Sequence, residues 1–236
     1  LWHHWALAET TGETAADTGA SDTQTDGAIA ATLVGNAAML GGDLGGVAFD
    51  GNGDYLDFGE NLVFSGAKGI TFGFWMRSKP FTSNEPHGHF VWLADLAAGG
   101  HGGTSYNQFA FWGYSGNAER ANLGLYNAGA YGTTGDFSNF MCDHNVWCHL
   151  SASASPAGTY TLRRYNPDND DHAEFFAYNK QPPNPNAIEY KYAAVGCHIN
   201  INGVRQCVNG DLRDVRFYEH AIDADEAATL AGLPAP

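Results

Sequence analysis

The middle of the chain gathers aromatic, amide and guanidinium side chains, a combination that suits the binding of sugars. Sugars present flat C–H faces that stack on aromatic rings, and amide and guanidinium groups hydrogen-bond their hydroxyls. In the segment 108–114 (QFAFWGY), strand alternation places Trp112 and Tyr114 on one face, while Phe111 faces the core. The alternative is that the rings of Trp112 and Tyr114 pack within the second layer of the sandwich. The predicted ligand-binding positions are Asn107, Trp112, Tyr114, Arg120 and Tyr126.

The sequence gives little support for a pair of carboxylates that could cleave a glycosidic bond. A glycoside hydrolase needs two carboxyl groups about 5–9.5 Å apart. The nearest acidic cluster lies in a Pro- and Asn-rich stretch, which favours a solvated loop over a catalytic pair. The sequence contains neither a Gly-x-Ser-x-Gly elbow nor an HExxH motif. The members of the acidic cluster are Asp168, Asp170, Asp171 and Glu174.

Histidine and tyrosine side chains offer two further chemistries. His87, His89 and His101 could hold a transition metal, and the alternative is that they are plain polar residues of loops. A polysaccharide lyase could use a Tyr/His pair for proton abstraction, without paired carboxylates. The spacing selects no such pair, so an enzyme is the least favoured functional class. The residues available for a pair are Tyr106, Tyr114, Tyr126, His89 and His101.

The charge balance excludes two classes of partner. With 11 Lys and Arg against 26 Asp and Glu, the net charge is −15. A surface this acidic repels phosphate backbones and anionic lipids, so we expect neither nucleic acid nor a membrane as a partner. The sequence also has no apolar stretch of the ~18 residues that a membrane helix needs. Such acidity serves solubility or attracts divalent cations.

The cysteines of the chain predict two local disulfides. Four cysteines allow three pairings, and the close spacings favour Cys142–Cys148 and Cys197–Cys207. Neither spacing matches a zinc finger or a CxxC redox motif. Disulfides form in oxidising compartments, so we expect a secreted, extracellular or periplasmic protein. The start of the chain lacks the basic and apolar stretches of a signal peptide, so a secreted precursor is expected to have lost one.

Short alternating segments, separated by Gly, Asn, Asp and Pro, predict an all-β protein. In 70–77 (ITFGFWMR), alternate residues such as Phe72 and Phe74 form an apolar face. Gly73 then lets a neighbour pack close or marks a bulge. A surface loop is expected at 9–30. The predicted strands are 1–8, 31–34, 46–50, 55–58, 69–77, 89–95, 108–114, 122–127, 146–154, 160–165, 173–178, 190–195 and 210–218.

One helix is predicted near the end of the chain. Asp223 can cap it, Glu226 completes a capping box, and Gly232 can end it. These thirteen strands and one short C-terminal helix indicate an antiparallel two-sheet sandwich. We expect residues 1–236 to form a single domain, because sandwiches often run to ~200–250 residues as one unit.

Five segments in a fixed order carry a family resemblance. They are 5–19 (with WALAETTG and ADTG), 45–56 (GGVAFDGNGDYL), 72–76 (FGFWM), 145–150 (NVWCHL) and 209–226 (NGDLRDVRFY, then AIDADE). Together they resemble the laminin-G-like, or concanavalin-A-like, jelly-roll domains. The resemblance implies a jelly-roll sandwich. The stretches least similar to the family lie between 81 and 140 and from 160 to 195, and we expect them to determine binding specificity, because loops carry function on a rigid scaffold.

The resemblance also implies a structural Ca²⁺ between the first loop and the last strand. Hard cations of this kind bind carboxylate and backbone carbonyl oxygens. The matching acidic residues are Asp17 together with Asp211 or Asp214, and carbonyls of 41–43 could complete the shell. The alternative is that Asp17 makes an Asx-turn and Asp214 makes a turn or ladder contact.

Three functional classes follow, in order of preference. The first is an extracellular, non-catalytic, lectin-like module that binds a glycan, stabilised by calcium and disulfides. The second is a structural or adhesion subunit that packs against copies of itself or against another extracellular protein. The third is a polysaccharide lyase or hydrolase. Trp75 and Trp147 match strand positions of the family, which implies that these two rings are structural.

Overall fold

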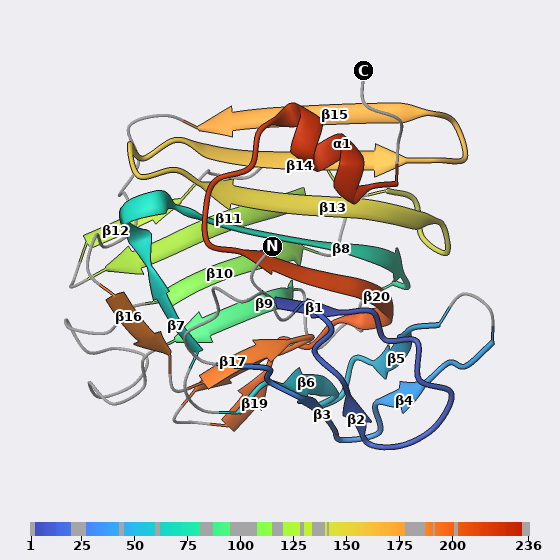
Figure 1. Cartoon of the computed structure of the whole chain (residues 1–236). Helices are drawn as coiled ribbons and strands as arrows, with labels where there is room; N and C mark the ends of the chain where they lie inside the picture. Colours follow the sequence, from blue (N-terminus) through green and yellow to red (C-terminus); the bar gives the residue numbers. More distant parts are fainter. Residues whose placement is uncertain are drawn as a thin grey trace.

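A computed structural model shows two antiparallel sheets facing each other, with one short helix across the first (Figure 1). The antiparallel two-sheet jelly-roll sandwich predicted from the sequence is confirmed. Strands predicted between 31 and 218 are present, with ends shifted by one or two residues. The structure describes residues 3–19, 27–42, 45–59, 62–80, 87–94, 108–114, 120–127, 130–133, 140, 142–177, 187–190, 192–200 and 203–232.

The first sheet, sheet A, contains the longest strands and carries the helix. Its strands follow the order β15-β14-β13-β8-β20-β5-β4, and β1 also pairs with β20. Their bounds are β15 (Asp171–Ala177), β14 (Tyr160–Asn166), β13 (Trp147–Ala154), β8 (Ile70–Ser78), β20 (Asn209–Tyr218), β5 (Val47–Asp50), β4 (Ala38–Met39) and β1 (His3–Trp5).

The second sheet, sheet B, lies behind sheet A in Figure 1. Its order is β12-β11-β10-β9-β17-β6-β3-β2. The bounds are β12 (Ala130–Thr133), β11 (Arg120–Asn127), β10 (Gln108–Tyr114), β9 (His87–Ala94), β17 (Tyr192–Val195), β6 (Tyr55–Asp57), β3 (Ala31–Val34) and β2 (Thr14–Ala15). Two small ribbons pair β16 (Ala187–Tyr190) with β7 (Leu62–Ser65) and β18 (His198–Asn200) with β19 (Gly203–Arg205), and the 3-10 turn η1 is Gly66–Lys68.

Aromatic rings from the two sheets meet in the core. Phe72 and Phe74 of β8 are fully buried and pack on Phe111 of β10, with ring centroids 5.9 and 6.0 Å apart. The predicted apolar face of β8 and the predicted core position of Phe111 are therefore confirmed. The first strand is shorter than predicted, because Leu7 adopts a left-handed conformation with φ of 56° that ends regular pairing.

The outer face of β13 is also buried, although its residues are polar. Leu150, Ala152 and Ala154 face the core, and His149, Ser151 and Ser153 lie on the opposite face. The helix α1 (Ala224–Leu230) lies against this outer face of sheet A in Figure 1. Residues on both sides of β13 are therefore shielded from solvent.

The predicted capping box of α1 is formed. The backbone N–H of Glu226 donates to Asp223 Oδ1 at 2.9 Å, and the N–H of Asp223 donates to Glu226 Oε2 at 3.3 Å. Ala227 and Leu230 are buried against the sheet. In the part of the chain that the structure describes, no helix is long and apolar enough to cross a membrane.

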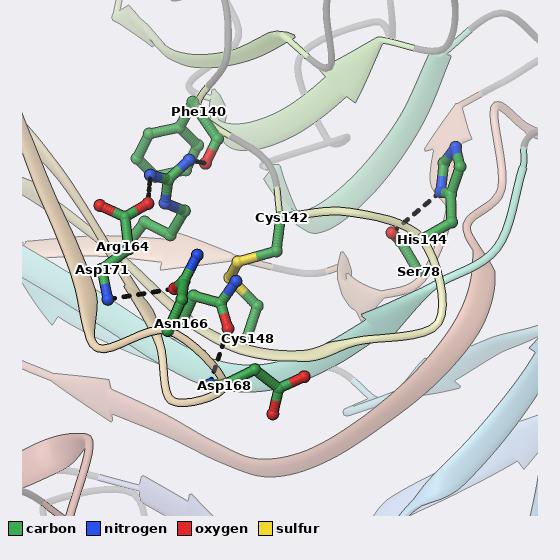
Figure 2. Close-up of a disulfide and its surroundings, with 10 residues drawn as sticks. Ser78, Phe140, Cys142, His144, Cys148, Arg164, Asn166, Asp168 and Asp171 are labelled. Carbon is green, nitrogen blue, oxygen red and sulfur yellow. Dashed lines mark hydrogen bonds and ion pairs between the residues drawn. A yellow bond between two sulfur atoms is a disulfide. The ribbon is translucent and has the colours of Figure 1, made fainter.

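Both predicted disulfides are present, Cys142–Cys148 and Cys197–Cys207. Figure 2 shows the first of them beside Arg164, whose guanidinium donates to the carbonyl of Phe140 at 3.3 Å and forms an ion pair with Asp171. The segment before β13 and the β14–β15 hairpin are thus joined by this arginine. Two disulfides are what a protein of an oxidising compartment carries.

Candidate functional site

The register of sheet B brings most of the predicted ligand positions onto one face. Trp112 lies opposite Asn122, and Tyr114 lies opposite Arg120. Residues directly opposite each other in an antiparallel pair share a face. These positions alternate with Phe111, which is in the core, so they belong to the outer face of the sheet.

Tyr126 belongs to the same face, because its partner Gln108 alternates in step with Trp112. Tyr131 of β12 lies opposite Tyr126 and extends the row of aromatic positions. We call this set, Trp112, Tyr114, Arg120, Tyr126 and Tyr131, the β9–β12 face. The fifth predicted position, Asn107, lies outside the described residues.

The predicted histidine cluster falls partly on the same face. His89 lies opposite Trp112 and His87 lies opposite Tyr114. His101 and Tyr106 lie outside the described residues. The residues that the structure describes include no group of three or more His, Cys, Asp or Glu arranged to hold a metal ion. A transition-metal site and a Tyr/His catalytic pair therefore stay predictions.

Of the acidic residues predicted to bind calcium, Asp17 is surrounded by N–H groups. Its carboxylate accepts the backbone N–H of His4 at 3.0 Å, of Gly19 at 2.9 Å and of Ile29 at 3.2 Å. It also lies 2.6 Å from Nδ1 of the buried His3. Burial raises the pKa of Asp17, but these hydrogen bonds outweigh it and hold the pKa below its usual value.

Asp214 lies in a bulge of β20, with a left-handed φ of 55°. Its Oδ1 is 2.6 Å from Nε2 of His4 and 2.8 Å from Nε of Arg216. Burial raises the pKa of Asp214. The hydrogen bond from His4 and the charge of Arg216 lower the pKa by more than burial raises it, so the net shift is downward. His4 thus bridges Asp17, through its backbone, and Asp214, through its ring.

Asp211, the third acidic residue, has different partners. It is buried and pairs with Arg77 at 2.6 Å and with Lys79 at 3.3 Å. The structure therefore brings Asp17 and Asp214 together around His4 and leaves Asp211 with two cations. A calcium ion would have to displace these N–H donors, and calcium binding stays a prediction.

The acidic cluster that the sequence assigned to a solvated loop is only partly a loop. Asp168 and Asp170 lie in the turn between β14 and β15, but Asp171 and Glu174 lie in β15 itself. Both strand residues are paired with arginines of β14, Asp171 with Arg164 and Glu174 with Arg163. The interpretation as loop was wrong for Asp171, because its partner stands across the hairpin, whereas Glu174 lies in the strand predicted at 173–178.

A cavity of about 290 Å³ opens between the outer face of sheet A and α1, and we call it the α1 cavity. On the sheet side it is lined by His149 and Ser151 of β13, Arg163 and Tyr165 of β14, and Glu174 of β15. On the helix side it is lined by the alanines of α1 and Ala231 just after it. One wall is therefore polar and the other consists of methyl groups.

Ion pairs and rings fix the polar wall. Arg163 pairs with Glu174 through Nε, and its Nη1 donates to the carbonyl of Ile222 at 3.3 Å, just before α1. Tyr165 packs on His172 with ring centroids 4.5 Å apart. The guanidinium of Arg163 therefore joins β14, β15 and the residue Ile222 before α1.

His149 is neutral at physiological pH. Burial lowers its pKa to about 4; the negative charge of Asp214 raises the pKa and the positive charge of Arg216 lowers it. The ring lies over Gly73 of β8, where a Cβ would come within 3.4 Å of Nε2. Gly73 thus lets a neighbour pack close, as predicted, and it also lies opposite the bulge of β20.

Beside the α1 cavity, arginines and tryptophans alternate on the outer face of sheet A. The guanidinium of Arg213 lies 4.4 Å from the ring centre of Trp147 and 5.3 Å from that of Trp75. Arg77 lies 5.1 Å from the Trp147 ring centre. Cation–π contacts of this kind hold both tryptophans in place outside the core.

The sequence reasoning missed the α1 cavity. The alternation of polar His149, Ser151 and Ser153 with apolar residues in β13 was the available indication, since it marks a polar outer face. The sequence could not show that α1 would close over that face.

No family model and no curated protein matches the sequence. Solved structures do match the fold. Tailspike protein 2 of an Escherichia coli O157:H7 bacteriophage is 15% identical with a TM-score of 0.60, over 89% of this chain and 28% of its own. The receptor-binding domain of botulinum neurotoxin type G is 11% identical with a TM-score of 0.60, over 96% of this chain and 49% of its own.

A third match is the CBM40 domain of a Ruminococcus gnavus IT-sialidase, bound to α2,3-sialyllactose. It is 12% identical with a TM-score of 0.54, over 75% of this chain and 95% of its own. This chain spans about a quarter of the tailspike chain and about half of the neurotoxin structure. At these identities the similarity shows a shared β-sandwich fold.

Proposed function

We propose that this chain is an extracellular, non-catalytic glycan-binding domain, and that the β9–β12 face is its binding surface. The observation that carries the proposal is the register that gathers Trp112, Tyr114 and Tyr126 with Arg120 on one sheet face. Aromatic platforms with hydrogen-bonding groups beside them are what sugars require. The fold shared with a sialyllactose-bound CBM40 supports the proposal, as do the two disulfides.

The composition of this face favours a neutral glycan. The chain as a whole is strongly acidic, with a net charge of −15, which disfavours polyanionic chains. Arg120 is the cationic position among the residues named for the β9–β12 face, and a guanidinium offers several N–H donors for hydroxyls. A row of aromatic positions across β10, β11 and β12 suits an extended oligosaccharide.

The test is a glycan array followed by calorimetry on the glycans that bind. The double variant Trp112→Ala/Tyr114→Ala should weaken binding about tenfold or more, because stacked rings contribute about 0.5–1.5 kcal/mol each beyond their buried area. The matched control is Phe176→Ala on β15, a 43% exposed ring on the other sheet, which should leave binding unchanged.

Three outcomes would contradict the proposal. Binding that survives in the double variant would move the site elsewhere. A defined oligomer with no glycan signal would favour the structural or adhesion subunit. Shorter chains, or the absorbance of an unsaturated product after incubation with polysaccharides, would show that the protein is a hydrolase or a lyase.

A further inference from the structure

We propose that the α1 cavity is a second binding site, which takes a single uncharged sugar ring. The cavity lies on sheet A, and the β9–β12 face lies on sheet B. The inference therefore rests on different residues from the proposed function, and it stands or falls separately.

An unsatisfied hydroxyl points to a ligand in this cavity. Ser151 lines the cavity, is 1% exposed, and its Oγ has no hydrogen-bond partner among the described residues. Buried polar groups are nearly always hydrogen-bonded, and leaving one unpaired is costly. A group entering the cavity with a hydroxyl would satisfy it.

His149 offers a second hydrogen-bonding group on the same wall. It is 4% exposed, and the ring of Trp75 lies edge-on to it with ring centroids 5.5 Å apart. Because the ring is neutral, one nitrogen donates and the other accepts. His149 and Ser151 stand two residues apart on β13, roughly 7 Å, so they can meet two different hydroxyls of one ring.

The charge of the cavity favours a neutral ligand. The arginines that line it are paired, Arg163 with Glu174 and Arg164 with Asp171, and His149 carries no charge at neutral pH. An anionic sugar would have to compete with Glu174 for the guanidinium, and an amine would have to compete with Arg163 for the carboxylate. Both competitions cost more than the hydrogen bonds of a neutral hydroxyl.

The opposite wall suits the C–H face of a ring. Four alanines line it, Ala224, Ala227, Ala228 and Ala231, which present methyl groups and no polar side chain. A ligand with hydroxyls on one edge and C–H groups on the other complements both walls. The volume of about 290 Å³ lies at the small end of ligand pockets, so one ring fits and an extended chain does not.

The experiment uses the full chain with ¹³C-labelled alanine methyl groups, observed by NMR. The probes are D-glucose, D-galactose and N-acetyl-D-glucosamine, with D-glucuronate and D-glucosamine as charged comparisons. We expect a neutral sugar to shift the methyl signals of the four α1-cavity alanines, and the charged sugars to shift them less. No shift with any neutral sugar, or stronger binding of a charged one, would overturn the proposal.

A matched pair of serines separates binding from folding. Ser151→Ala removes the unpaired hydroxyl, so the free protein should be at least as stable, while the dissociation constant of the sugar rises about tenfold. Ser153→Ala removes a hydroxyl that is bonded to Thr71 Oγ1 at 2.8 Å, so stability should fall while sugar binding stays unchanged. Equal affinity in Ser151→Ala and the unaltered protein would refute the site.

Different variants test the two proposed binding sites. Trp112→Ala/Tyr114→Ala should leave the alanine methyl shifts intact while it lowers the glycan-array signal. Loss of the methyl shifts in this double variant would place sugar binding on sheet B and remove the α1-cavity proposal alone.

Discussion

The α1 cavity and the β9–β12 face occupy the outer surfaces of opposite sheets and are built differently. At the cavity, a helix covers buried polar residues. Arg163 bonds to the carbonyl of Ile222 before the helix, and His149 packs on Trp75. On the β9–β12 face, aromatic positions follow one another across neighbouring strands. A covered pocket selects one small unit by its walls, whereas the surface proposed on sheet B is expected to take an extended ligand. The comparison predicts that the two regions respond to different perturbations.

The largest effect should come from the core that both regions share. Phe74→Ala deletes a fully buried ring that packs on Phe90 and Phe111 of sheet B. We expect about 3–5 kcal/mol of lost stability in urea unfolding and weaker binding in both regions. Phe176→Ala, at a ring that is 43% exposed, should cost clearly less stability. Loss of one binding activity without the other in Phe74→Ala would show that the sheets are not coupled through this ring.

Acid should affect the α1 cavity before the β9–β12 face. The folded pKa of His149 is about 4 against a usual 6.5, so below pH 6.5 the unfolded chain takes up a proton that the folded chain does not. Stability is therefore complete above pH 6.5 and falls by about 3 kcal/mol as the pH drops toward 4. His149→Gln should flatten this part of the profile, measured by thermal unfolding at a series of pH values.

The lowered pKa values of Asp17 and Asp214 act in a more acidic range. Their carboxylates stabilise the fold above their usual pKa of 3.8, and that contribution is lost as the pH falls through the lower folded values. This second loss should be the same in His149→Gln. An unchanged profile between 6.5 and 4 in that variant would show that His149 is not the group that titrates.

The smallest effect should come from the cap of α1. Asp223→Ala removes the side chain that accepts from the N–H of Glu226, at a cost of about 0.5–2 kcal/mol. Hydrogen exchange at the amides of Ala227 and Ala231 should become faster, and sugar-induced shifts in the α1 cavity should weaken. Glycan binding at the β9–β12 face should not change. A parallel loss at both regions would contradict their independence.

The sequence predicted what depends on local pattern. Alternation in 70–77 located β8 and its buried face, and the Asp223/Glu226 pair located the start of α1. Close spacing was enough to pair Cys142 with Cys148. The register that groups Trp112 with Arg120 follows from the strand assignment, since a short connection forces the two strands to be antiparallel neighbours.

The sequence could not predict what depends on distant partners. The cavity exists because α1 lies over β13 and β14, and no local pattern in either segment encodes that docking. Asp171 was assigned to a loop because Asp and Asn surround it, whereas it lies in a strand and pairs with Arg164 across the hairpin. Asp214 likewise obtains its partner from His4, at the other end of the chain.

The placement of β20 has a consequence for how the protein is made. This strand lies between β8 and β5 and also pairs with β1, and the His4–Asp214 bond joins residues 210 positions apart. A ribosome releases β1, β5 and β8 long before β20 exists, so these strands wait with unpaired edges during most of synthesis. Contacts this distant in sequence form slowly, and unpaired strand edges invite aggregation. The central seam of sheet A should therefore close last, after translation has passed the strand that completes it.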